Sequence, residues 1–450
     1  MPSKKTKKPE PPSRRALPFG SVALLLQGGG ALGAYQAGVY EALAEADLHP
    51  DWVAGISIGA INSAIIAGNS PEQRIDKLRQ FWEGLTANSL GTSVGQFRDA
   101  AKNYPLFALF DQTGSAAAAA GAEASEFMFS HWPGAYTQKL HEFWERMAKK
   151  PFEHLLCEME SFVVKGDISR GVINQMSAAY TLLNGVPGFF SPRVPGPWLL
   201  PTGSLDATSY CDPSPLKSTL EQLIDFDRIN AGETRLSVEA VNVRSGNYVY
   251  FDSTSEKIRV EHIMASGALP PGFPAVEIDG EYYWDGGLVS NTPLQLIMDS
   301  TPRHDTLAFQ VDLWSARGGL PRNMTDVMTR QKEIQYSSRT RASTDRFKEA
   351  QKARHAFSTL YNQLPENLKK SPEAKMLHDV SDHKAYNIVH LIYRAKNYEG
   401  DSKDYEFSRL SMQDHWRAGY DDTVRALRHK EIFQRPKSSE GVAIFDFVRG

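Results

Sequence analysis

The chain lacks the features that mark secreted, membrane-spanning and nucleic-acid-binding proteins. Its two cysteines, Cys157 and Cys211, are too few for a disulfide framework in 450 residues. No stretch approaches the roughly 18 continuous apolar residues of a membrane-spanning helix. With 50 basic against 53 acidic residues the net charge is -3, so no overall basic surface favours nucleic acid. We therefore expect a cytoplasmic globular protein without a metal or another cofactor.

Positive charge is concentrated only at the N-terminus. Residues 1–20 form a basic, proline-rich segment whose composition predicts disorder. The same charge favours a second interpretation, a peripheral contact with anionic membrane lipids, since each basic residue near such a surface contributes about 1 kcal/mol. A cleaved secretory signal is excluded because its removal would destroy the glycine turn that follows.

The most informative stretch is 21–59. The apolar run Val22–Leu26 predicts a central parallel strand, and a glycine-rich turn then opens an amphipathic helix. A second strand, Trp52–Ile56, leads into the pentapeptide Gly55-Ile56-Ser57-Ile58-Gly59. This G-x-S-x-G pattern is typical of a nucleophile elbow, a sharp strand-to-helix turn that exposes a serine hydroxyl. The turn glycines are Gly28, Gly29, Gly30 and Gly33.

The same glycines also match the dinucleotide fingerprint G-x-G-x-x-G. That fingerprint requires an acidic residue at the end of the second strand, about 20 residues further on. Asp47 and Asp51 both precede the second strand, and the elbow occupies the position where the carboxylate should be. We therefore interpret the glycines as part of an oxyanion hole, together with the N–H group of Ile58 at the start of the next helix.

A third motif lies more than two hundred residues downstream. Glu277–Trp284 predicts a hairpin that presents Asp285-Gly286-Gly287, and the preceding segment Glu261–Pro274 contains the pattern A-S-x-A-x-P-x-x-F-P. Taken in order, the glycine turn, the elbow and the aspartate motif resemble the patatin-like phospholipase family over about residues 21–312. One departure is Leu32, which stands where many bacterial members carry Arg or Lys, so the backbone N–H groups alone would stabilise an oxyanion.

The resemblance implies both a fold and a mechanism. The implied fold is an α/β three-layer sandwich with a mostly parallel central sheet. The implied mechanism is a Ser-Asp dyad, in which Ser57 is the nucleophile and Asp285 is the general base. The oxyanion donors would be the N–H groups of Gly28, Gly29, Gly30 and Ile58. The remaining motif positions are Gly33, Gly55, Gly59, Gly286 and Gly287.

The rest of the chain predicts additions to this domain. The irregular, aromatic and proline-rich region 90–201 is expected to be an insertion or lid. From 313 to 450 the composition becomes charged and helix-prone, which indicates a mainly helical C-terminal region. Within it, 386–393 has the pattern of a strand and 407–428 that of a helix. The sequence does not indicate an oligomeric state.

Three functions remain open at this point. The first is a serine hydrolase of phospholipid or lysophospholipid esters. The second is an acyltransferase of the malonyl-transacylase type, in which the elbow serine has a histidine partner. His304 is the least poor candidate for that histidine, whereas His262 is better explained as a structural neighbour of the site segment. The third is a lipid-binding protein without catalytic activity.

Overall fold

One mixed β-sheet organises the molecule in the computed structural model. The structure describes residues 17–87, 167–300, 302–337, 340–436 and 441–447. Most of the basic N-terminal segment and residues 90–166 of the expected insertion therefore lie outside the described residues. The strands of this sheet are β1 (Ser21–Leu26), β2 (Trp52–Ile56), β5 (Arg235–Asn242), β6 (Tyr248–Asp252), β7 (Val276–Ile278), β8 (Glu281–Asp285), β9 (Thr306–Asp312), β10 (Tyr386–Ile392) and β11 (Val442–Asp446).

The strand order is β11-β10-β9-β1-β2-β5-β8-β7, and β6 pairs with β5 beside this path. The six strands from β11 to β5 run parallel, whereas β6, β7 and β8 pair antiparallel. A short separate ribbon joins β3 (Ser191–Pro192) to β4 (Cys211–Asp212). The mostly parallel sheet confirms the predicted α/β class.

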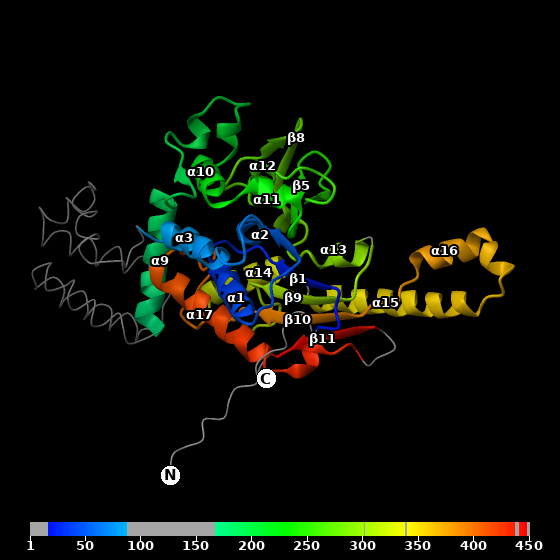
Figure 1. Cartoon of the computed structure of the whole chain (residues 1–450). Helices are drawn as coiled ribbons and strands as arrows, with labels where there is room; N and C mark the ends of the chain where they lie inside the picture. The colour runs from blue at the N-terminus through cyan, green and yellow to red at the C-terminus, as the bar shows by residue number, and fades with distance from the viewer. Residues whose placement is uncertain (1–16, 88–166, 301, 338–339, 437–440, 448–450) are drawn as a thin grey trace, which may run out of the picture.

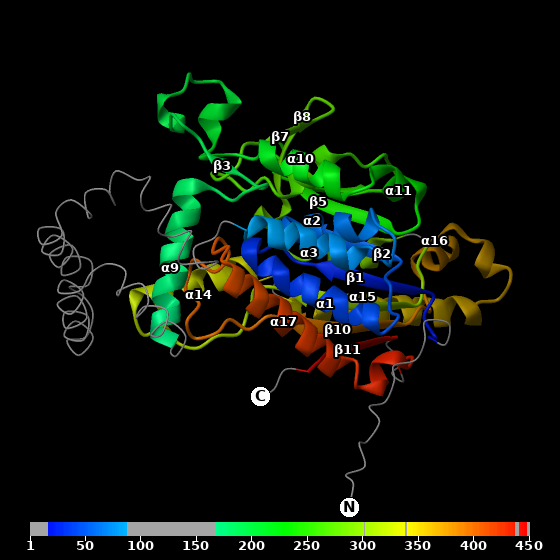
Figure 2. The ribbon, with the colours of Figure 1, turned by 60° about the vertical axis from the view of Figure 1, so that its left-hand side comes forward.

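Helices cover both faces of the sheet, which makes three layers (Figures 1 and 2). The α-helices are α1 (Ala34–Glu45), α2 (Ile58–Ala67), α3 (Arg74–Leu85), α9 (Asp167–Asn184), α10 (Ser214–Leu223), α11 (Phe226–Ala231), α12 (Val260–Ser266), α13 (Leu294–Asp299), α14 (Met324–Tyr336), α15 (Thr340–Gln363), α16 (Pro372–Val380) and α17 (Arg409–Ala426). Among the described residues, no helix combines the length and the apolar character that crossing a membrane requires.

Successive side chains of a strand point to opposite faces of the sheet, so the strands contribute to two hydrophobic cores. In β1, Val22, Leu24 and Leu26 pack into the larger core with α1, α2 and α17. Ala23 and Leu25 point the other way, into a smaller core that includes residues of α13 and α15. An unbroken apolar strand is therefore needed here, because both faces of β1 are buried.

The C-terminal region is built into this domain. Besides its helices it adds β10 and β11 to the sheet, and β10 pairs with β9 along its whole length. Helix α17 crosses α1 at close range: a β-carbon on Gly38 would lie 1.8 Å from the carbonyl oxygen of Trp416, and one on Gly419 would lie 1.9 Å from that of Tyr35. Sequence periodicity predicted the strand at 386–393 and the helix at 407–428, but not β11.

Candidate active site

Ser57 lies at a strained turn between β2 and α2. Its backbone has φ 57° and ψ -124°, a region that non-glycine residues rarely adopt. The first turn of α2 begins at once, since the N–H of Ala60 donates to the carbonyl of Ser57 at 2.9 Å. The chain therefore turns sharply enough to leave the Ser57 side chain partly exposed, although its neighbours Ile56 and Ile58 are buried.

The two glycines of the pentapeptide are required by close backbone approaches. A β-carbon on Gly55 would lie 2.2 Å from the carbonyl oxygen of Gly59. A β-carbon on Gly59 would lie 2.2 Å from the carbonyl oxygen of Leu26, at the end of β1. Gly33 is similarly confined, because a β-carbon there would lie 2.5 Å from Cγ1 of Ile58. The G-x-S-x-G pattern thus reflects the packing of the turn against itself and against β1.

The register of β5 explains how Asp285 reaches Ser57. Ile56, the last residue of β2, pairs with Glu239. Asp285, the last residue of β8, pairs with Ala240, the next residue of β5. Because β6 occupies the opposite edge of β5, β2 and β8 share one edge and their ends meet there. The structure therefore brings together the serine and the aspartate that the sequence singled out.

The Asp285 carboxyl group is buried and has two hydrogen-bond donors. The Ser57 side chain is one donor, and the N–H of Gly287 is the other, at 2.7 Å. Burial raises the pKa of Asp285 to about 7, while these two hydrogen bonds act in the opposite direction. A β-carbon on Gly286 would lie 2.8 Å from the carbonyl oxygen of Glu239, so the chain after Asp285 packs directly on β5. The resulting carboxyl group changes its charge near neutral pH.

The glycine turn runs beside the serine, but its N–H groups differ in what they contact. The N–H of Gly28 donates to Oδ1 of Asn291 at 3.2 Å, so this expected oxyanion donor is already engaged. Among the described residues, no hydrogen-bond acceptor is found for the N–H groups of Gly29, Gly30 and Ile58. Of the four predicted donors, only the N–H of Gly28 therefore has an acceptor among the described residues.

Two polar residues near the serine carried no signal of their own in the sequence. Oγ of Ser266, the last residue of α12, accepts the N–H of Ser57 at 3.0 Å. Asn291 joins the glycine turn to α14, since its Nδ2 donates to the carbonyls of Gly28 at 3.2 Å and Tyr336 at 2.8 Å. Ser266 lies in the segment 261–274 that sequence reasoning marked as a whole, whereas Asn291 follows the aspartate motif without a recognisable pattern.

The histidine alternative is not supported by the fold. His304 precedes β9, whose first residue Thr306 pairs with Ser21 at the start of β1. Ser57 follows the end of β2, which runs parallel to β1. His304 and Ser57 therefore lie at opposite ends of the sheet. His262 is buried in α12, where its Nδ1 accepts the N–H of Arg259 at 2.9 Å.

A small apolar pocket lies beside the segment that follows α12. It is connected to the dyad through the chain after α12, because the N–H of Asp285 donates to the carbonyl of Ala268 at 3.0 Å. Ser266, which accepts the N–H of Ser57, is two residues earlier. The pocket is lined by Phe189, Pro213, Leu216, Met264, Gly267, Ala268, Phe273 and Val276.

Three comparisons show which known proteins this chain is similar to. A family described as Patatin-like phospholipase matches residues 24–298, and one described as Patatin phospholipase matches residues 334–439. The mouse (Mus musculus) patatin-like phospholipase domain-containing protein 7 is 36% identical over 101 residues, which are 22% of this chain and 7% of that protein. The crystal structure of VipD from Legionella pneumophila is 14% identical and covers 95% of this chain and 71% of that one, with a TM-score of 0.35.

The match to the first family spans more than half of the chain and contains all three motifs. The residues of these motifs follow or end strands β1, β2 and β8 of the mostly parallel sheet. The chain belongs to the patatin-like phospholipase family.

Proposed function

We propose that the protein hydrolyses carboxylic esters of phospholipids or lysophospholipids through an acyl-enzyme on Ser57. The observation that carries the proposal is the strained Ser57 turn, which presents a partly exposed hydroxyl to the buried carboxyl group of Asp285. Membership of a phospholipase family supports a lipid substrate.

The proposed acylation step follows from the positions of these groups. Ser57 Oγ attacks the ester carbonyl carbon while its proton passes to the Asp285 carboxylate. The negative charge that develops on the carbonyl oxygen is stabilised by the N–H groups of Gly29, Gly30 and Ile58. When the tetrahedral intermediate collapses, the C–O bond to the alcohol breaks and Asp285 returns the proton to the leaving alcohol oxygen.

Deacylation repeats these steps with a water molecule in place of the serine hydroxyl. Asp285 takes a proton from a water molecule, whose oxygen attacks the acyl carbon. The bond to Ser57 Oγ then breaks and Oγ recovers the proton. A histidine is not needed, since burial raises the pKa of Asp285 to about 7 and makes it a stronger base than an exposed carboxylate.

Labelling with a fluorophosphonate probe tests the proposal. The wild-type protein should be labelled and should cleave p-nitrophenyl and phospholipid esters, whereas Ser57→Ala should do neither. Formation of an acylated acceptor in place of free fatty acid would indicate the acyltransferase. A wild-type protein that neither reacts with the probe nor cleaves any ester would contradict both enzymatic functions and favour lipid binding alone.

We also propose that the protein acts in the cytoplasm and contacts anionic membranes through its basic N-terminal residues. Six basic residues against one acidic residue among the first fifteen support this contact. Co-sedimentation with phosphatidylserine vesicles should fall when the basic residues are replaced by glutamine. Equal sedimentation of both proteins would contradict the proposal.

A further inference from the structure

The glycine turn contacts a loop of the C-terminal region that contains residues 401–404. The N–H of Ala31 donates to the carbonyl of Asp404 at 2.7 Å. Gly30 has φ 55°, and a β-carbon on it would lie 2.0 Å from the same carbonyl oxygen. The main chain of Asp404 therefore contacts Gly30, one of the proposed oxyanion donors, and the next residue, Ala31.

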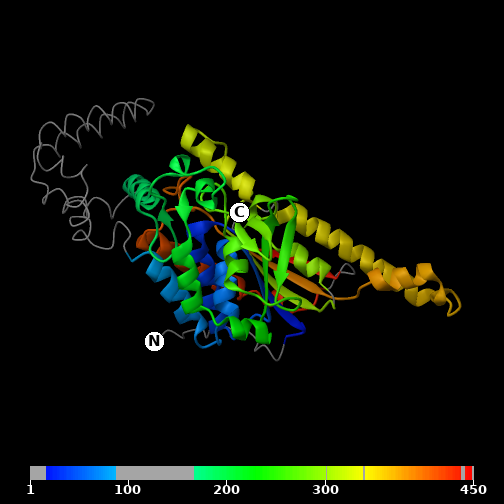
Figure 3. The ribbon, with the colours of Figure 1, turned by 90° about the horizontal axis from the view of Figure 1, so that it is seen from above.

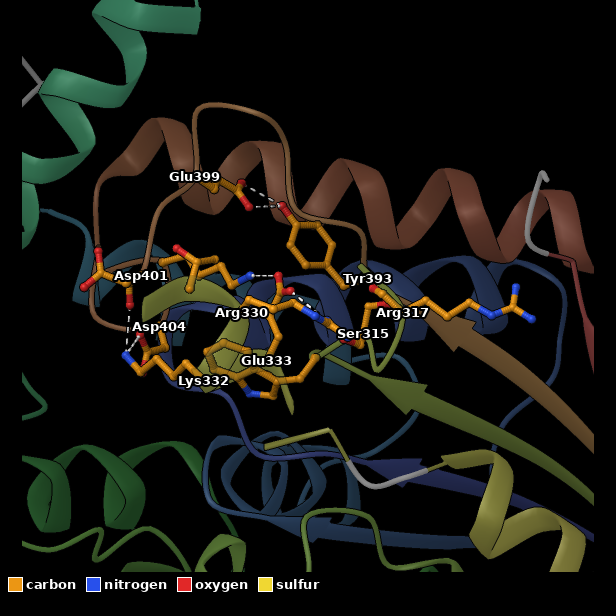
Figure 4. Close-up of polar contacts among 12 residues, drawn as sticks. Ser315, Arg317, Arg330, Lys332, Glu333, Tyr393, Glu399, Asp401 and Asp404 are labelled. Carbon is orange, nitrogen blue, oxygen red and sulfur yellow. Dashed lines mark hydrogen bonds and ion pairs between the residues drawn. The ribbon is translucent and has the colours of Figure 1, made fainter. Parts of the chain in front are cut away.

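Two ion pairs from helix α14 hold that loop. Lys332 Nζ lies 2.6 Å from Oδ1 of Asp404 and donates to the carbonyl of Asp401 at 2.9 Å (Figure 4). In the second ion pair, Lys403 Nζ lies 2.7 Å from Oε1 of Glu333, the residue next to Lys332. The Lys403 side chain is buried, at 3% exposed, and that of Glu333 is 15% exposed. Two adjacent residues of α14, Lys332 and Glu333, are thus paired with two adjacent residues of the loop, Asp404 and Lys403.

A third contact joins the same cluster to the other side of the glycine turn. Nε1 of Trp314 donates to the carbonyl of Gly28 at 3.1 Å. Lys403 Nζ lies 5.1 Å from the centre of the Trp314 ring, within the range of a cation–π interaction. A β-carbon on Gly29 would lie 3.1 Å from Trp314 Nε1, so the indole leaves the turn little freedom.

We propose that Lys403, Glu333, Lys332 and Trp314 are positioning residues that hold the glycine turn in the conformation in which its N–H groups stabilise the oxyanion. The inference rests on the proposed function. It assigns a task to the part of the chain after β9 (Thr306–Asp312), including the loop within the matched range 334–439. The physical reason is that a Gly-Gly-Gly turn is intrinsically flexible, and a shift of about 1 Å at a donor costs up to about 10²-fold in rate.

The effect should appear in transition-state stabilisation rather than in substrate binding. Replacing Lys403 with methionine removes one of the two cations beside Glu333, the other being Arg330 at 3.1 Å, and it also removes the cation from the Trp314 ring. We expect Lys403→Met to lower kcat by about 10- to 100-fold, with KM changing by less than about threefold. Lys403→Arg keeps the charge and should remain within about threefold of the wild type.

The experiment compares variants per active site. The fluorophosphonate probe, reacted to completion, counts functional Ser57 hydroxyls, and kcat and KM are then measured with a p-nitrophenyl ester. An alkyl trifluoromethyl ketone forms a reversible anionic adduct with the serine, so its affinity reports oxyanion stabilisation. In Lys403→Met this affinity should fall by the same factor as kcat.

Lys369→Met is the matched control. Lys369 pairs with Glu366 in the segment between α15 and α16. These two helices project away from the sheet (Figures 1 and 3). This variant should behave as the wild type. If Lys403→Met does not fold, Trp314→Phe keeps an aromatic ring but removes the hydrogen bond to Gly28, and it should lower kcat and the ketone affinity together by about tenfold.

Unchanged kcat per titrated site and unchanged ketone affinity in the soluble variants would overturn the inference, even if their melting temperatures fall. A wild-type protein that the probe does not label would instead contradict the proposed function itself, and this inference with it.

Discussion

The serine turn and the glycine turn lie side by side but are held in different ways. The serine turn is confined by its own pentapeptide and by the end of β1, since Gly55 faces Gly59 and Gly59 faces Leu26. The glycine turn is held by residues hundreds of positions away: Asn291, Trp314 and Asp404. The serine turn is therefore confined largely by its own residues and the end of β1, with one hydrogen bond from the N–H of Ser57 to Ser266. The donors of the glycine turn depend on contacts with distant segments.

The largest effect should come from the locally held serine. Ser57→Ala removes the proposed nucleophile, and we expect hydrolysis to fall by about 10⁴-fold or more, because removing such a group disables the whole acyl-enzyme route. The measurement is ester cleavage at saturating substrate, with the melting temperature as a check of folding. Activity within tenfold of the wild type would show that the turn is only structural.

The next largest effect should come from a change of Asp285, the last residue of β8. Asp285→Asn preserves the shape but removes the base, so we expect kcat to fall by about 10²- to 10⁴-fold. In the wild type, kcat/KM should rise with pH through about 7, since only the ionised carboxylate accepts the Ser57 proton. A flat profile between pH 5 and 9 would contradict the assignment of Asp285 as the base.

The same buried carboxyl group should reduce stability at alkaline pH. Between about pH 4 and 7 the folded protein keeps the Asp285 proton and the unfolded chain releases it, so stability falls as pH rises. Above pH 7 the cost is up to about 4 kcal/mol, which Asp285→Asn avoids. The melting temperature of the variant relative to the wild type should therefore be higher at pH 8 than at pH 5. Ser57→Ala, which retains the carboxyl group, should not show this relative gain.

The smallest effects test how tightly the serine turn is confined. Gly59→Ala places a β-carbon against the Leu26 carbonyl, and we expect a loss of about 3 kcal/mol in the free energy of unfolding. Gly84→Ala is the control, because Gly84 is an exposed residue of α3 with no atom within 4 Å of an added β-carbon. It should gain up to about 1 kcal/mol. Equal effects of the two changes in urea unfolding would contradict the local confinement.

Much of the fold could be predicted from short patterns. The runs at 22–26 and 52–56 are strands as predicted, and the hairpin before Asp285 is present. The prediction failed at β11 because a short edge strand with half-buried residues has no distinctive period. Within the helix-prone region 313–450, α14 ends at Tyr336 and α15 begins at Thr340, a break that propensity alone does not indicate.

The site could be predicted less completely than the fold. Ser57 and Asp285 were marked by glycines that only a sharp turn requires, so the sequence carries their signal. Ser266 accepts one backbone N–H, and Asn291 makes three hydrogen bonds to backbone groups. The pattern A-S-x-A-x-P-x-x-F-P contains Ser266 without assigning it a role, and no pattern surrounds Asn291. The occupation of the Gly28 N–H by Asn291 was unexpected for the same reason.

The sequence by itself determined that a serine stands in a strand-to-helix turn, that glycines flank it and that an aspartate ends a distant hairpin. These features are local, because backbone strain and close approach restrict which residues a turn accepts. Only the tertiary structure decided that the ends of β2 and β8 meet on one edge of β5 and that a C-terminal loop supports the glycine turn. Such contacts depend on strand register and on ion pairs between distant segments, which no short stretch of the chain encodes.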